Sequence, residues 1–162
     1  MDVHLKNSAD ETTQISDEAL IAQFPSYAVD RDTAPRFRGW LRHEYLIDRC
    51  DSCGLLREPP GPICPKCWST DFTRTAISGS GTIYLSIALH QGPPTPGVDY
   101  SNPYPIVTVE LDEQPGLRIT STVVDAELSE IEIGKRVRLA WRERNGAPLP
   151  VFELVAEGQA QS

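Results

Sequence analysis

The 162-residue sequence contains few aromatic residues and no excess of basic charge. Phe, Trp and Tyr make up 7% of the chain, and apolar residues of all kinds make up 40%. Such a composition supports only a modest hydrophobic core, so an additional stabilising element is expected. The net charge of −8 argues against a general nucleic-acid binder, which would carry a basic face.

The sequence also lacks a long apolar segment. No run approaches the roughly 20 residues needed to cross a bilayer. The N-terminal segment MDVHLKNSADETTQ has neither the basic start nor the apolar centre of a secretion signal. We therefore expect a cytoplasmic protein. In that reducing environment, four cysteines indicate a metal site before disulfides.

Motifs for catalysis are missing as well. The sequence has no P-loop, no dinucleotide-binding fingerprint and no GxSxG nucleophile motif. His90 ends a predicted strand just before a Pro-rich loop, but no nucleophile motif accompanies it. We therefore expect no catalytic residue in this chain.

The N-terminal part, residues 1–31, is predicted to be an acidic tail followed by an extended arm. Residues 1–32 hold seven acidic and two basic side chains, which account for −5 of the total charge. Residues 1–16 show no periodicity and are predicted to be disordered. Residues 17–31 have scattered apolar side chains and a proline, which favours an extended arm.

Residues 32–45 are predicted to form an amphipathic helix, since Phe37, Trp40, Leu41 and Tyr45 recur at helical spacing. The arm and this helix carry more large apolar groups than a small ribbon can cover, and exposed apolar patches usually mark interfaces. We therefore predict docking on a partner, with packing inside the chain as the alternative. The predicted partner-binding residues are Phe24, Tyr27, Phe37, Trp40, Leu41 and Tyr45.

Residues 46–70 contain two CxxC pairs, Cys50/Cys53 and Cys64/Cys67. Four thiolates at this spacing suit tetrahedral zinc in a closed, structural site. A pair of disulfides and a redox dithiol are the alternatives. Trp68 follows the second pair, where such a loop usually has glycine.

Residues 71–157 are predicted to form a barrel, because Thr-, Val- and Ile-rich runs follow one another with a period of two. The loop over residues 91–105 is rich in proline and is predicted to be rigid and irregular. The expected strands cover residues 72–78, 81–89, 105–111, 117–124 and 136–142, with a short additional run at 150–155.

The order of these segments resembles a known family. The stretches DTAPRFRGWLRHEYLIDRCDSCG, CPKC, SGSGTIYLSIALH, YPIVTVELDE and IGKRVRLAWRE resemble the acyl-CoA-associated zinc-ribbon/OB-fold family called domain of unknown function thirty-five. The resemblance implies a mainly β fold with an N-terminal helix, a rubredoxin-like zinc ribbon and a five-stranded OB-fold barrel.

Members of that family are generally not enzymes by themselves. The resemblance implies a non-catalytic, zinc-binding accessory subunit that binds and organises an acyl-CoA enzyme of the thiolase fold, such as a thiolase, an acyl-CoA synthase or a retro-aldolase. A partner subunit of a MaoC-type enoyl-CoA hydratase is one alternative. A single-stranded nucleic-acid-binding protein is another, since OB barrels bind single strands, but the net charge opposes it.

The strand expected over residues 136–142 alternates apolar residues with Arg136, Arg138 and Arg142. The ordinary interpretation is a core face and a solvent face. The alternative is that the arginines contact the phosphates of coenzyme A, because guanidinium groups bind phosphate in a bidentate manner. Arg118 would join them if its strand were a neighbour.

Overall fold

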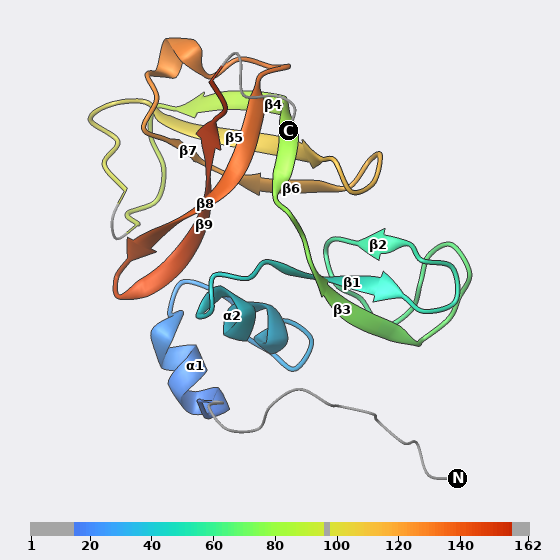
Figure 1. Cartoon of the computed structure of the whole chain (residues 1–162). Coiled ribbons are helices and arrows are strands. Elements are labelled where there is room, and N and C mark those ends of the chain that lie inside the picture. Colours follow the sequence, from blue (N-terminus) through green and yellow to red (C-terminus); the bar gives the residue numbers. More distant parts are fainter. Residues whose placement is uncertain (1–14, 96–97, 157–162) are drawn as a thin grey trace, which may run out of the picture.

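A computed structural model describes residues 15–95 and 98–156 of the chain. Within this part, two short helices, a three-stranded sheet and a six-stranded sheet follow one another along the sequence. Figure 1 shows the helices and the small sheet below the larger sheet. Nearly all of the segment predicted to be disordered, residues 1–16, lies outside the described residues.

The first helix, α1 (Asp17–Gln23), shows that the prediction of an extended arm is wrong for this stretch. The helix begins at Ser16, whose hydroxyl accepts a hydrogen bond from the Ala19 N–H at 3.2 Å. Such capping satisfies a backbone donor that has no partner inside the helix. Leu20 is completely buried, so the helix is held by packing.

The second helix, α2 (Ala34–Trp40), is shorter than the predicted range of 32–45. The chain turns immediately after it, and His43 adopts a left-handed backbone with φ of 59°. Gly39 allows this turn to pack closely, because a Cβ at that position would stand 2.8 Å from the Glu44 carbonyl oxygen. The aromatic stripe therefore continues past the end of the helix.

The three-stranded sheet has the order β2-β1-β3, with β1 (Leu46–Cys50) between β2 (Leu56–Arg57) and β3 (Phe72–Ala76). The prediction that the strand over residues 72–78 belongs to the barrel is wrong. All five residues of β3 pair with β1 in antiparallel register, from Leu46–Ala76 to Cys50–Phe72. Only three residues separate β3 from the next strand, so the sequence shows no break between the two sheets.

The six-stranded sheet has the order β6-β5-β4-β8-β9-β7. Only Thr122 separates β6 from β7, and β7 pairs with β9 in parallel. The two ends of the sheet are therefore halves of one chain segment, which closes the sheet into a five-strand barrel of the OB type. The strands are β4 (Ser80–Leu89), β5 (Tyr104–Leu111), β6 (Arg118–Ser121), β7 (Val123–Val124), β8 (Arg136–Arg144) and β9 (Ala147–Leu154).

The final strand, β9, is longer than the run predicted at 150–155, and it belongs to the barrel, where it pairs with β8. A short 3-10 helix, η2 (Leu128–Glu130), lies between β7 and β8. Inside the barrel, alternate residues of neighbouring strands are almost free of solvent, as expected for one buried sheet face. They include Ile83, Val107, Val109, Val137 and Phe152.

In the described part of the chain, no helix is long and apolar enough to cross a membrane.

Candidate metal centre

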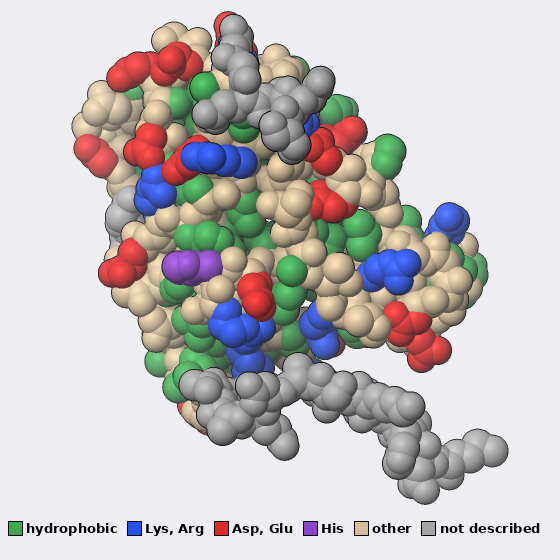
Figure 2. Space-filling model, viewed as in Figure 1, with side chains coloured by type: hydrophobic (Ala, Val, Ile, Leu, Met, Phe, Trp, Pro, Cys, Tyr) green, Lys and Arg blue, Asp and Glu red, His purple; other side chains and the backbone are tan. Residues whose placement is uncertain are grey.

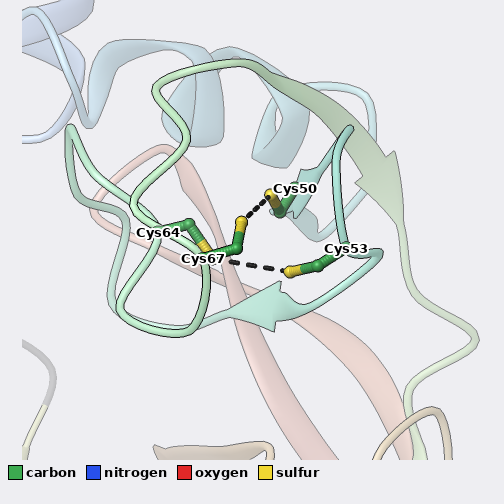
Figure 3. Close-up of side chains that lie close together, drawn as sticks. All are labelled: Cys50, Cys53, Cys64 and Cys67. Carbon is green, nitrogen blue, oxygen red and sulfur yellow. Dashed lines mark hydrogen bonds between the residues drawn. The ribbon is translucent and has the colours of Figure 1, made fainter.

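Two loops of the small sheet bring the four cysteines together (Figure 3). The four Sγ atoms lie within 4.8 Å of one another. The Sγ atoms of Cys50 and Cys67 are 3.5 Å apart, and those of Cys53 and Cys64 are 3.6 Å apart. Zn–S bonds of about 2.3 Å at tetrahedral angles place sulfurs ~3.8 Å apart, so the cluster fits a zinc ion.

The same distances show no disulfide, because a covalent S–S bond measures about 2.05 Å. All four cysteines are free thiols in the structure. The zinc-ribbon prediction is confirmed in this respect: the structure brings the predicted ligands into one cluster suited to a structural zinc.

The backbone of the two cysteine loops is closely similar. The Cys50 N–H donates to the Leu55 carbonyl at 2.9 Å, and the Cys64 N–H donates to the Ser69 carbonyl at 2.8 Å. In each loop, the residue after the second cysteine has a left-handed backbone; φ is 74° at Gly54 and 65° at Trp68. The loops therefore present their thiols to the centre from two sides in the same way.

Backbone donors also prepare the thiols for metal binding. A hydrogen bond from the Cys53 N–H is the main cause that lowers the pKa of Cys50. Burial raises the pKa of Cys64, but hydrogen bonds from the Cys67 and Lys66 N–H groups, together with those from the Cys53 and Cys67 side chains, lower that pKa to about 6. A backbone hydrogen bond lowers the pKa of Cys67, but burial and the neighbouring thiols outweigh it and raise that pKa. Since the thiolate is the ligand form, the backbone donors favour metal binding.

Chemically, such a centre can hold the loops in place. Cys50 and Cys64 are fully buried, and the four sulfurs supply all four corners of a tetrahedron. A zinc ion held by four thiolates offers no open position for a substrate or water. Its role is therefore to stabilise the ribbon, and zinc binding of this kind contributes roughly 10 kcal/mol to folding.

The predicted partner-binding aromatics are mostly covered by the chain itself. Trp40 contacts five aromatic rings, with centroid distances between 4.9 and 6.4 Å. They belong to α2, to β8, to the segment that follows α1 and to the residue before β1, and are those of Phe24, Tyr27, Phe37, Tyr45 and Trp141. Trp40 is only 6% exposed, and Phe24, Phe37 and Tyr45 are similarly buried. Docking of these four side chains on a partner is therefore not what the structure supports. Tyr27 remains partly exposed, and Leu41 packs at the edge of the core.

The four predicted coenzyme-binding arginines do not form one cluster. Arg118 lies on β6, and β5 and β4 separate it from the strand β8 that carries the other three. Each arginine is paired with a carboxylate of this chain. The pairs are Arg118–Glu110, Arg136–Asp112, Arg138–Glu153 and Arg142 with both Asp125 and Glu153. Contact with coenzyme A stays a prediction.

His90 lies exposed beyond the end of β4, and it forms no hydrogen bond, ion pair or ring contact with another described residue. The Pro-rich segment after it is irregular where it is described, and β5 already begins at Tyr104.

The structure also shows a site feature that the sequence pattern did not predict. The Arg36 guanidinium donates to the Glu58 carboxylate at 2.7 Å, linking α2 to the ribbon. Beside this pair, a cavity of about 580 Å³ opens between the helices, the Pro-rich loop and the barrel. Its walls include Tyr27, Tyr100 and Arg144. Because these groups come from distant segments, no local motif could have revealed the cavity.

Fold and centre together define a zinc-ribbon/OB-fold protein. The model of the ChsH2 rubredoxin-like zinc ribbon domain matches residues 38–73, and that of the ChsH2 C-terminal OB-fold domain matches residues 74–142. A scaffold protein with a DUF35 domain from Methanocaldococcus jannaschii is 36% identical over 110 residues, which are 65% of this chain and 75% of that protein. The chain therefore belongs to the DUF35 family.

Two solved structures of DUF35 proteins also resemble this chain. A solved structure described as "Ltp2-ChsH2(DUF35) aldolase" matches with a TM-score of 0.72 and 37% identity, over 80% of this chain and 99% of that one. A DUF35 protein of unknown function from Sulfolobus solfataricus shares the fold, with a TM-score of 0.55 and 11% identity, over 83% of this chain and 94% of its own.

One relative is longer than this chain. A probable enoyl-CoA hydratase alpha subunit from Thermomonospora curvata is 37% identical over 141 residues, which are 86% of this chain. The chain spans only 43% of that relative's length.

Proposed function

We propose that this chain is a non-catalytic accessory subunit that binds and organises an acyl-CoA enzyme of the thiolase fold. The observation that carries the proposal is its close likeness, at 37% identity, to the DUF35 chain of the "Ltp2-ChsH2(DUF35) aldolase" structure. The scaffold name of the Methanocaldococcus relative supports the same role.

The chemistry of the described residues supports the non-catalytic part of this proposal. The group of potential metal ligands found among them is the four-cysteine centre, which has no open position. Among the residues that the structure describes, the exposed His90 has no side-chain partner that would make it a general base. Catalysis therefore belongs to the partner, and this chain supplies structure.

The cavity beside Arg36 supports a place for the acyl-CoA in the same complex. Ligand sites often lie between structural units and combine apolar walls with a few polar groups. Here Trp40 and Tyr104 give aromatic surface, and Arg144 gives positive charge, whereas the charge of Arg36 is already paired with Glu58. Binding of an acyl-CoA in this cavity is tested by titration, with the quenching of tryptophan fluorescence as the signal.

A MaoC-type hydratase is the second candidate partner. The observation that favours it is the 37% identity to the named hydratase alpha subunit, across 86% of this chain. Single-stranded nucleic acid is less well supported. An OB barrel would stack bases on exposed aromatic rings of its strands. Here Tyr84 lies under the Arg118 guanidinium at 3.5 Å, and Trp141 stacks on His43.

Purification of the tagged chain from its native cells, followed by identification of what remains bound, tests the proposal. We expect a thiolase-fold enzyme in a fixed ratio to this chain. A MaoC-type protein in its place would favour the second candidate. A chain that elutes alone, with its zinc intact, would contradict both.

A further inference from the structure

One edge of strand β4 is unpaired over half of its length. β4 pairs with β5 from Gly81 to Leu89, but with β8 only over residues 80–82. At Ile83, the segment before β8 covers the edge: the Ile83 N–H donates to the Lys135 carbonyl at 2.9 Å. From Tyr84 to Leu89, the backbone along this edge forms no hydrogen bond with any described residue. The Ser86 hydroxyl, on the inner face, donates to the Ile131 carbonyl at 3.3 Å.

A β-bulge at Tyr84 separates the paired and unpaired halves. The register with β5 shifts between Ile83 and Leu85, so that one extra residue is accommodated on β4. Bulges bend a strand and end its pairing on one side. In Figure 1, the second half of β4 runs across the top of the barrel, below the orange segment that contains η2.

The unpaired half of β4 also presents apolar side chains to solvent. Leu85 and Ile87 are each 46% exposed. The residue between them, Ser86, pairs with the fully buried Val107, so Leu85 and Ile87 point to the outer face. Leu128 and Ile133, in the segment that lies beside β4, are exposed as well.

Proteins usually protect an exposed strand edge with lysine, proline or an inward-pointing charge. The segment YLSIAL, residues 84–89, contains no charged residue and no proline. Its free edge and outer apolar face therefore suit the addition of another strand.

The charge beside this edge indicates the character of that strand. Glu127, Glu130 and Glu132 are exposed in the segment that carries Leu128 and Ile133. Figure 2 shows acidic side chains gathered at the top of the molecule, over the place of η2. We call Glu127, Glu130 and Glu132 the acidic rim. An incoming segment with Lys or Arg beside its apolar residues would complement this rim.

We propose that the Tyr84–Leu89 edge is a docking site for an extended segment of the catalytic partner, which adds a strand to the barrel. The segment carries apolar residues at alternate positions and basic residues beside them. The proposal rests on the proposed function, because the occupant is a part of the partner enzyme.

Hydrogen exchange of the purified complex and of the free chain tests this docking. In the complex, we expect backbone amides within residues 84–89 to gain protection. The double variant Leu85→Glu, Ile87→Glu keeps the barrel intact, because both side chains point outward, and it lowers affinity for the partner by about tenfold or more. Added salt weakens binding of the wild-type chain, since the rim is acidic.

The matched control is Ile63→Glu, which changes an apolar side chain of similar exposure, 48%, on the ribbon. It leaves the affinity unchanged, and both variants retain zinc. Failure of every variant and of the wild type to bind contradicts the proposed function. This docking site is overturned if the complex forms while the amides of residues 84–89 stay unprotected. It is also overturned if the double variant changes the oligomeric state of the free chain, since the edge would then bind a second copy. Protection of these amides in the free chain that is lost when residues 157–162 are deleted would likewise overturn it, since the edge would then bind this chain's own C-terminal segment.

Discussion

Trp68 occupies in the second cysteine loop the position that Gly54 occupies in the first. Both residues have a left-handed backbone, and the N–H of each donates to the carbonyl of the first cysteine of its loop, at 2.8 Å for Gly54 and 2.9 Å for Trp68. This backbone is open to glycine but unfavourable for a bulky residue. The Trp68 side chain is 79% exposed, so little packing offsets the strain.

Replacement at these two positions has different effects on stability. We expect Gly54→Ala to lower the unfolding free energy by about 1 kcal/mol, since alanine is strained at positive φ. Trp68→Gly relieves backbone strain but raises the conformational entropy of the unfolded chain. We therefore expect the unfolding free energy to change by no more than about 1 kcal/mol, and zinc to be retained. Denaturant unfolding of the zinc-loaded chains measures both. Loss of zinc from Trp68→Gly would show that the indole has a further role.

Loss of a buried thiol removes the metal. In Cys64→Ser, we expect less than one zinc ion per chain and an unfolded ribbon, because a hydroxyl is a poor zinc ligand and Cys64 is fully buried. Metal analysis and circular dichroism check this. Ser52→Ala, which alters an exposed residue in the same loops, serves as the control and keeps its zinc. A Cys64→Ser chain that folds normally without metal would contradict the structural role.

Trp40 is expected to stabilise the fold of this chain rather than to contact a partner. Trp40→Ala removes a side chain that is 94% buried among aromatic rings, since it is 6% exposed, and such a change costs about 3–5 kcal/mol of stability. A chemical unfolding curve measures the loss. Unchanged stability together with lost partner binding would restore the idea that this aromatic group is a docking surface.

The pH dependence of stability reports on Glu58. Burial raises its pKa above 4.5, and the opposing effect of Arg36 is smaller. The native state therefore holds this proton to a higher pH than the unfolded chain does. The contribution of Glu58 to the free energy of unfolding therefore falls as the pH rises from the pKa in the unfolded chain to the raised pKa in the native state.

A Glu58→Gln variant lacks this titration. We expect the wild type to become less stable relative to Glu58→Gln as the pH rises from 4.5 through the raised pKa of Glu58. Unfolding curves for the two chains, with zinc content checked at each pH, give the difference. A difference that does not vary with pH would show that Glu58 titrates normally.

The metal centre could be predicted from the sequence because its signal is local. The spacing of the cysteines is enough to place four sulfurs around one ion, and the structure brings them together. The period-two runs likewise predicted most strands within one or two residues. They could not assign β3 to its sheet, because strand pairing is non-local and β3 leads into β4 almost without a break.

The helical region shows a different limit. The helical spacing predicts the apolar stripe that contains Phe37 and Trp40, but periodicity does not specify which residues cover that stripe. It is covered by Phe24, just after α1, and by Trp141 on β8, which is about 100 residues further along the chain. Similarly, the free edge of β4 depends on where β8 begins, which no local pattern specifies.

The decisive measurement is the rate of acyl-CoA turnover by this chain alone, by the purified partner enzyme alone and by their complex. We expect no turnover by this chain, and activity in the complex that exceeds that of the separated partner. Turnover by the isolated chain that survives rigorous purification, or a partner whose stability and activity are indifferent to this chain, would contradict the proposed function.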